Sequence, residues 1–143
     1  MNVAAILKLK GRAVATATET ATLAEITRTL AAKKIGAVVI TDHRGHVAGI
    51  VSERDIIRVI ATAGTGVLDK PVAHAMTRDV ITCTEDRTLD ELMSLMTAKR
   101  FRHLPIVEGG KLIGIVSIGD VVKHHIAEVE MEATAMRDYI AHT

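Results

Sequence analysis

The residues with the clearest potential for chemistry belong to a motif that the chain contains twice. Residues 49–55 read Gly-Ile-Val-Ser-Glu-Arg-Asp, and residues 114–120 read Gly-Ile-Val-Ser-Ile-Gly-Asp. Each copy ends a run of β-forming residues and begins a helical pattern. It therefore places a hydroxyl, unpaired backbone N–H groups and a carboxylate at one strand-to-helix boundary. We refer to the two boundaries as the first junction and the second junction.

Both junctions combine groups that suit a nucleotide. The N–H groups and the dipole of a helix N-terminus attract phosphate, and the hydroxyl of Ser52 or Ser117 can donate a further hydrogen bond. The carboxylate of Asp55 or Asp120 repels phosphate but can accept two hydrogen bonds from a vicinal diol, as in ribose. The same Ser-x-x-Asp spacing is also close to an ordinary capping box, which only closes a helix end. The motif by itself leaves both interpretations open.

The duplication extends through both halves of the chain. A shift of 66 residues superimposes identical residues from Arg12 on Arg78 through Ile40 on Ile106, and after one deletion a shift of 65 superimposes the two junctions. Two copies at this long period predict a pseudo-twofold pair packed face to face rather than an open array.

Each half predicts the same order of elements: strand, helix, two strands joined by a hairpin, and helix. In the first half a short alternating run at 14–18 precedes a capping box formed by Thr22 and Glu25, after which apolar residues recur at helical spacing. Thr88 and Glu91 repeat that capping box in the second half. Glycines between the paired strands supply the positive φ that tight hairpins require.

We divide the chain into a first repeat at 1–62, a linker at 63–71, a second repeat at 72–127 and a helical extension at 128–143. Pro71 suits the first turn of a short linking helix. The sequence leaves open whether the first ten residues form a helix or merely cover a cleft.

Composition indicates one compact α+β body and narrows the function. The 143 residues are 48% hydrophobic, the formal net charge is +1, and Phe101 and Tyr139 are the only aromatic residues. This combination excludes a typical nucleic-acid surface, which needs basic and aromatic groups. Apolar runs are too short for a membrane span and no signal peptide is recognisable, so we expect a soluble, cytoplasmic protein. The lone Cys83 is expected to pack within a strand at 80–83.

The order of the motifs resembles a tandem pair of CBS domains, the regulatory module of the cystathionine β-synthase type. Both halves have a short strand with threonines, an amphipathic helix, a small-apolar strand (36–40 and 103–107) and Gly-Ile-Val-Ser-x-x-Asp. The resemblance implies two βαββα repeats with clefts between them and modules that associate with one another. It also implies an adenosine-containing regulatory ligand such as AMP, ADP, ATP, S-adenosylmethionine or NAD, with serine near phosphate and aspartate on ribose. No cofactor is required.

The two junctions differ in charge. Arg54 precedes Asp55, whereas Gly119 precedes Asp120. Because arginine can pair bidentately with phosphate, we expect the first junction to be the better phosphate site. The alternative is that Arg54 is a solvated surface residue.

Residues outside the junctions complete the candidate site. Arg102 and His103 can supply charge or hydrogen bonds near the second junction, and Pro105 predicts an edge strand or an interface because proline cannot donate to a ladder. Thr16 and Thr82 lie on the first strand of each half, either as cleft lining or as ordinary exposed threonines. The candidate nucleotide-binding residues are Thr16, Ala37, Val38, Ser52, Arg54, Asp55, Thr82, Arg102, His103, Leu104, Pro105, Ser117 and Asp120.

No pattern predicts an enzyme or a metal site. The adjacent His124 and His125 point about 100° apart on a helix and cannot readily chelate one ion. The sequence has no recognisable Ser-His-Asp set, phosphate loop or dinucleotide fingerprint. We therefore assign no catalytic and no metal-binding residue. A weak nucleotide hydrolase would need a positioned base, and we identify none.

The C-terminal segment predicts one long amphipathic helix. Its apolar residues alternate between spacings of four and three: Val122, Ile126, Val129, Ala133, Met136 and Ile140. Because the helix extends beyond the second repeat, we expect it to pack across a homodimer interface. The alternative is that it folds back on its own module.

These features together predict a stand-alone regulatory protein that senses an adenosine nucleotide and acts in trans on a protein partner. The alternative is a ligand-independent dimeric scaffold in which both junctions are only structural caps. The sequence leaves open which nucleotide binds, how many bind and which partner responds.

Overall fold

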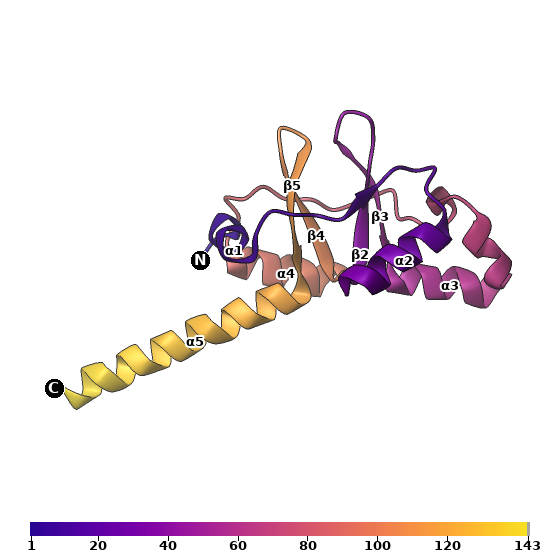
Figure 1. Cartoon of the computed structure of the whole chain (residues 1–143). Coiled ribbons are helices and arrows are strands. Elements are labelled where there is room, and N and C mark those ends of the chain that lie inside the picture. Colours follow the sequence, from indigo (N-terminus) through magenta and orange to yellow (C-terminus); the bar gives the residue numbers. More distant parts are fainter. Residues whose placement is uncertain (143) are drawn as a thin grey trace.

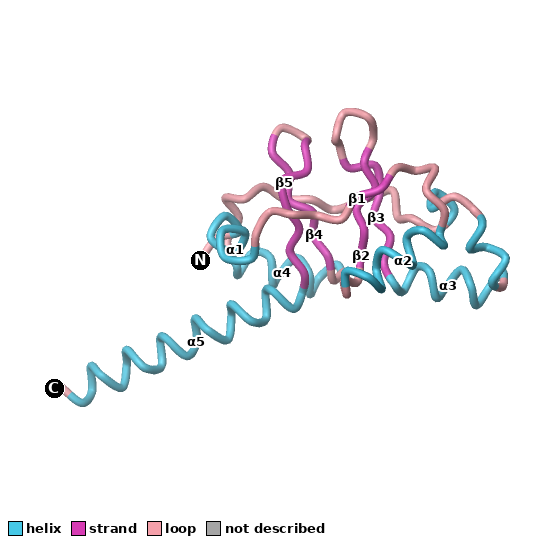
Figure 2. Tube along the Cα trace, viewed as in Figure 1, coloured by secondary structure: helices cyan, strands magenta, loops and turns pink. Residues whose placement is uncertain are grey.

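The protein has two similar halves that lie side by side in the computed structural model, which describes residues 1–142 (Figure 1). Its elements in chain order are α1 (Val3–Lys10), β1 (Thr16–Ala17), α2 (Leu23–Lys33), β2 (Ala37–Thr41), β3 (Val47–Ser52), α3 (Glu53–Ala63), the 3₁₀ helices η1 (Thr65–Asp69) and η2 (Val72–His74), α4 (Leu89–Lys99), β4 (His103–Glu108), β5 (Lys111–Ser117) and α5 (Ile118–Ala141). The two hairpins stand next to each other in the middle, with α2 and α3 beyond the first and α1 and α4 beyond the second (Figure 2).

The first half follows the predicted order of elements. β1 pairs in parallel with β2, and β2 pairs antiparallel with β3. Thr22 and Glu25 exchange hydrogen bonds in a complete capping box at the start of α2. Gly45 adopts a φ of 77° in the hairpin loop, and Gly64 ends α3 with a φ of 82°. Pro71 lies immediately before η2 rather than inside its first turn.

The second half repeats this order with a weaker first strand. β4 and β5 form an antiparallel hairpin around Gly109 and Gly110, which both have positive φ. In place of a strand at 80–83, only Cys83 pairs with Ile106, because it alone exchanges backbone hydrogen bonds with β4. The Cys83 thiol is buried and free, and burial raises its pKa to about 11. This confirms the expected packed thiol.

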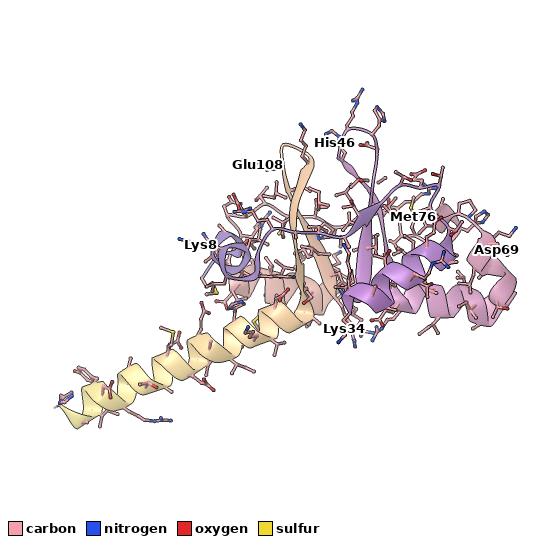
Figure 3. All side chains as sticks on the ribbon, in the orientation of Figure 1. Lys8, Lys34, His46, Asp69, Met76 and Glu108 are labelled. Carbon is pink, nitrogen blue, oxygen red and sulfur yellow. The ribbon has the colours of Figure 1, made fainter. Side chains whose placement is uncertain are left out.

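Two equivalent ion pairs between the segments that join the halves reflect the pseudo-twofold relation of the halves. Arg12 pairs with Glu85 across the halves at 2.8 Å, and Arg78 pairs with Glu19 at 3.3 Å. Each residue of one pair lies 66 positions from its counterpart in the other. The two hairpins also contact each other below their loops, where His46, labelled in Figure 3, forms a β-bridge with Lys111. The predicted pair of α+β repeats is confirmed.

Each half has its own hydrophobic core, and α1 belongs to the second one. Leu23, Val38 and Val51 are fully buried in the first core. Val3 and Leu7 of α1 are fully buried in the second core, together with residues of α4, β4, β5 and α5. The first ten residues thus contain a helix that packs on the half that follows later in the sequence. The boundaries of our sequence division stay a prediction.

The helix α5 is continuous, as predicted, and most of its length extends away from the body of the molecule (Figure 1). Val121 is fully buried, but the large apolar side chains of the predicted stripe are exposed, from 46% at Val122 to 65% at Ile140. Among residues 1–142, no helix combines the length and apolar character needed to span a membrane.

Candidate nucleotide site between the halves

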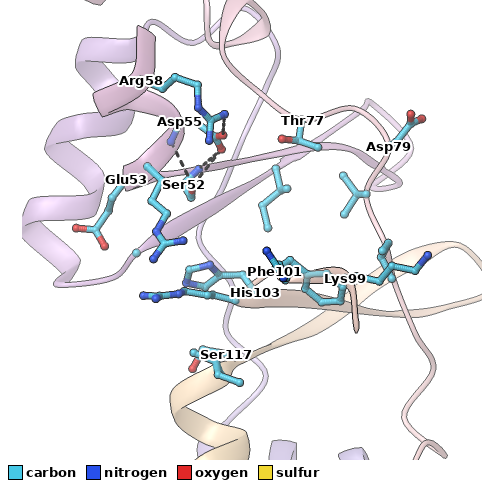
Figure 4. A pocket seen from close by; sticks show the side chains of 18 of the residues that line it. Ser52, Glu53, Asp55, Arg58, Thr77, Asp79, Lys99, Phe101, His103 and Ser117 are labelled. Carbon is cyan, nitrogen blue, oxygen red and sulfur yellow. Dashed lines mark hydrogen bonds and ion pairs between the residues drawn. The ribbon is translucent and has the colours of Figure 1, made fainter. Parts of the chain in front are cut away.

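A cavity of about 670 Å³ opens at the first junction, between the two halves (Figure 4). The first half contributes residues of β3 and α3, and the second half contributes the segments 77–81 and 99–103 together with the start of α5. In Figure 4, Ser52 and Asp55 lie on one side, and Phe101 and His103 lie across the cavity. The volume lies in the usual range for small-molecule sites.

Ser52 and Asp55 form a complete capping box at the edge of this cavity. The backbone N and the Oγ of Ser52 donate to Oδ2 of Asp55 at 2.8 and 3.0 Å, and the Asp55 backbone N donates to Ser52 Oγ at 3.4 Å. Oδ1 of Asp55 has only the long contact of 3.4 Å with Arg58, whose side chain is 71% exposed. The Asp55 side chain is 12% exposed, and among residues 1–142 an exposed arginine is the only partner of Oδ1 that a ligand would have to displace.

The cavity wall carries an excess of positive charge. Its acidic residues are Glu53, Asp55 and Asp79, and its lysine and arginine residues are Arg54, Arg58, Lys99, Arg100 and Arg102. A concave surface with several guanidinium groups attracts phosphate-bearing ligands and can bind them through paired hydrogen bonds.

An apolar part of the cavity lies beside the charged part. Ile50, Val80, Ile81 and Phe101 line it, and such a surface suits the flat face of a base. His103 lies next to them, and burial is the main reason that its pKa is below the usual value, with the charges of Lys10 and Arg102 acting in the same direction. Its imidazole is therefore neutral at pH 7 and can either donate or accept a hydrogen bond.

The second junction has the same capping box but a different neighbour. The backbone N and the Oγ of Ser117 donate to Oδ2 of Asp120 at 2.8 and 3.0 Å. Nζ of Lys10 contacts the same Oδ2 at 2.5 Å. Burial raises the pKa of Asp120, but the hydrogen bonds from Lys10 and Ser117 outweigh burial, so the pKa lies below its ordinary value.

The structure brings six of the thirteen residues expected from the sequence to the cavity wall: Ser52, Arg54, Asp55, Arg102, His103 and Ser117. Ala37, Val38 and Leu104 are instead buried in the cores. Thr16, Thr82, Pro105 and Asp120 also lie outside the lining of this cavity. Within β4, Pro105 accepts a hydrogen bond from the Cys83 backbone N.

Sequence reasoning missed most of the wall that the second half contributes. Thr77, Asp79, Lys99, Arg100 and Phe101 reach the first junction from segments far away in the sequence. The sequence did contain a signal for these residues. The 66-residue repeat predicts two pseudo-symmetric halves packed together, and in such a pair each junction faces residues of the other half. In the part of the chain that the structure describes, no cluster of three or more His, Cys, Asp or Glu residues is arranged to hold a metal ion.

Comparison with known proteins agrees with this geometry. The CBS domain profile matches the chain twice, at residues 9–62 and 72–126. A solved CBS-domain containing protein from Agrobacterium tumefaciens is 46% identical, with a TM-score of 0.84, over 87% of this chain and 99% of that one. A CBS domain protein from Pyrobaculum aerophilum, solved in complex with AMP, is 28% identical, with a TM-score of 0.75, over 84% and 89% of the two chains.

A curated relative is longer than the matched region. A 17.7 kDa protein from Acidianus ambivalens is 39% identical over 103 residues, which are 71% of this chain. The chain spans about three fifths of that relative, since the match covers 61% of its length.

Proposed function

The chain belongs to the CBS domain family, and from this premise we propose that it is a regulatory module that binds an adenosine nucleotide at the first junction. One observation carries the proposal: the cavity between the halves joins a partly free carboxylate, a cationic wall and an apolar surface. These three features suit the ribose, the phosphate and the base of one ligand. The complex of the Pyrobaculum aerophilum relative with AMP supports the same ligand class.

In this proposal each part of the ligand has its own partners. Asp55 accepts hydrogen bonds from the ribose hydroxyls after Arg58 moves aside. Arg54 and Arg102 bind phosphate, and Phe101 packs against the base. The proposed role of the cavity is binding rather than catalysis.

The proposed regulatory step is a change in the relation of the two halves. Because the cavity wall comes from both halves, a ligand that bridges them favours one relative arrangement over another. A ligand shifts such an equilibrium only by its difference in affinity for the two states. We propose that this shift is passed on to a separate protein partner.

We also propose that the protein is a homodimer held by α5. Val129 and Met136 are 49% and 60% exposed along the predicted stripe, which continues past the body of the molecule. Truncation before Glu130 should convert the dimer to a monomer in sedimentation velocity. A truncated protein that remains a dimer overturns this part of the proposal.

One observation favours a second candidate function, a scaffold without a ligand. Ser52 and Asp55 already satisfy each other as a helix cap, so the motif has a purely structural use. Under this alternative the cavity has no physiological occupant.

Thermal unfolding against AMP, ADP, ATP, NAD, S-adenosylmethionine and GTP separates the two candidates. A ligand at about 100 times its dissociation constant adds ~2.7 kcal/mol of stability, which is a shift of several degrees for a chain of this size. A shift with adenosine compounds supports the sensor, whereas no shift with any compound, in protein free of copurified nucleotide, favours the scaffold.

A double variant locates the binding site. Replacing Arg54 and Asp55 with alanine should abolish the ligand-induced shift while costing only about 1 kcal/mol of helix-cap stability. The matched control replaces Arg137 and Asp138, an adjacent arginine-aspartate pair on exposed α5, and should retain the full shift. Loss of the shift in both variants would contradict the assignment to the first junction.

A further inference from the structure

The last turn of α1 reaches the second junction, and no equivalent turn reaches the first junction. Val3 N donates to Arg87 O as Val72 N donates to Ala21 O, so α1 and η2 start in equivalent positions. Leu7 packs closely against Gly114, and Met76 packs closely against Gly49 at the equivalent position.

The two segments differ in length after these equivalent residues. Arg12 and Arg78 make equivalent ion pairs. Four residues separate Leu7 from Arg12, but only Thr77 separates Met76 from Arg78. The first segment therefore has three additional residues, which form the last turn of α1.

This additional turn places an ammonium group on the second junction. Lys10 Nζ donates to the Ile115 carbonyl at 2.9 Å and to Asp120 Oδ2 at 2.5 Å. The side chains of Lys10 and Asp120 are 29% and 22% exposed, so solvent reaches this contact in part, and the Asp55 side chain is 12% exposed. At the first junction, by contrast, the cation beside Asp55 is Arg58, an exposed arginine of the same helix whose contact is longer, at 3.4 Å.

Packing fixes the helix that carries Lys10. Val3, Ile6 and Leu7 have no exposed surface and hold α1 in the second core. Lys10 follows one turn later, so its ammonium group stays within reach of Asp120. The cavity wall accordingly includes Ser117, Ile118 and Gly119 but not Asp120.

We propose that Lys10 is an internal occupant of the second junction, which blocks the ribose position at Asp120 and limits the chain to one adenosine nucleotide. This inference rests on the proposed function. A ribose diol that takes both carboxylate oxygens would have to share Oδ2 of Asp120 with both Lys10 and Ser117, whereas among residues 1–142 Oδ2 of Asp55 accepts hydrogen bonds from Ser52 alone. A free ligand must therefore displace a tethered cation at the second junction, whereas at the first it displaces only an exposed side chain.

Isothermal titration with AMP tests this by counting sites in the full chain. The variant Lys10→Met removes the charge and keeps most of the stem. Lys8→Met is the matched control, because the Lys8 side chain has no hydrogen-bond or ion-pair partner among residues 1–142 (Figure 3). Wild type and Lys8→Met should bind one AMP per chain, and Lys10→Met should bind two. Adding Asp120→Ala to Lys10→Met should return the count to one.

The number of AMP molecules bound per chain distinguishes the possible outcomes. Two AMP per wild-type chain overturns the inference and leaves the proposed function intact, and so does a wild type that binds one AMP together with a Lys10→Met variant that also binds one or binds more weakly. No binding by wild type but one AMP per Lys10→Met chain supports the block and overturns the site at the first junction. No binding by any of the proteins overturns both.

Discussion

The two junctions share a motif and a cap geometry but differ in what surrounds them. Ser52 and Ser117 donate to the aspartate at their own junction at the same distances, 2.8 and 3.0 Å. One aspartate then faces a cavity and a displaceable arginine, and the other faces a tethered lysine. The motif thus sets the helix cap, whereas residues distant in the sequence make the surroundings of the two junctions different, and on that difference the proposed ligand preference rests.

The largest expected effect comes from loosening the helix that makes the junctions unequal. Leu7→Ala removes a fully buried side chain that packs against Gly114 and should lower the free energy of unfolding by about 2–5 kcal/mol. Urea unfolding measures this. Leu9→Ala, at a position 70% exposed in the same helix, should change it by less than about 0.5 kcal/mol. Equal losses in both variants would contradict the packing of α1.

The next effect separates the two aspartates by affinity. Asp55→Asn weakens the hydrogen bonds proposed to the ribose and should reduce AMP affinity about 10- to 100-fold, since hydrogen bonds to a charged group contribute about 1.5–3 kcal/mol. Asp120→Asn should change the affinity less than about twofold, because Lys10, which contacts Oδ2 of Asp120, is proposed to block that junction. Titration calorimetry on both variants checks this. Similar losses would mean that the junctions are functionally equivalent.

A smaller effect tests what the junctions have in common. Ser52→Ala and Ser117→Ala each remove a capping hydroxyl and should each cost about 1 kcal/mol in urea unfolding. Only Ser52→Ala should also weaken AMP binding. A much larger loss at one serine would show that the caps themselves are unequal.

The smallest effect is on the acid dependence of stability. The folded-state pKa of Asp120 is lowered, so its contribution is present above the ordinary pKa of about 3.9 and is lost as the pH falls through the folded value. Wild type should exceed Lys10→Met in stability at neutral pH by less than about 1 kcal/mol, and the gap should close in acid. Urea unfolding across pH 2–7 measures it. A gap that persists at pH 2 would have another cause.

Local patterns were sufficient to predict most of the fold. The capping boxes at Thr22 and Thr88, the hairpin glycines and the long C-terminal helix were expected and are present. Each depends on neighbouring residues, whose backbone and side-chain groups satisfy one another locally. The strand expected at 80–83 was only partly formed, because strand pairing depends on a partner distant in the sequence.

The candidate site was harder to predict because most of its wall is non-local. Lys99 and Phe101 reach the first junction from the opposite half, and nothing in their immediate sequence indicates this. The contact of Lys10 with Asp120 joins residues 110 positions apart. It depends on where α1 packs, and an eight-residue helix at the start of the chain has too few residues to show a decisive apolar pattern.

The placement of α1 also has a consequence for how the chain is made. Val3, Ile6 and Leu7 leave the ribosome well before their partners in β4, β5 and α5, such as Leu104, Val116 and Val121. At about 5–20 residues per second, these apolar side chains stay unburied for several seconds, until the residues that bury them have been synthesised. The first half can complete its own core during that time, so synthesis order favours folding of that half before α1 docks.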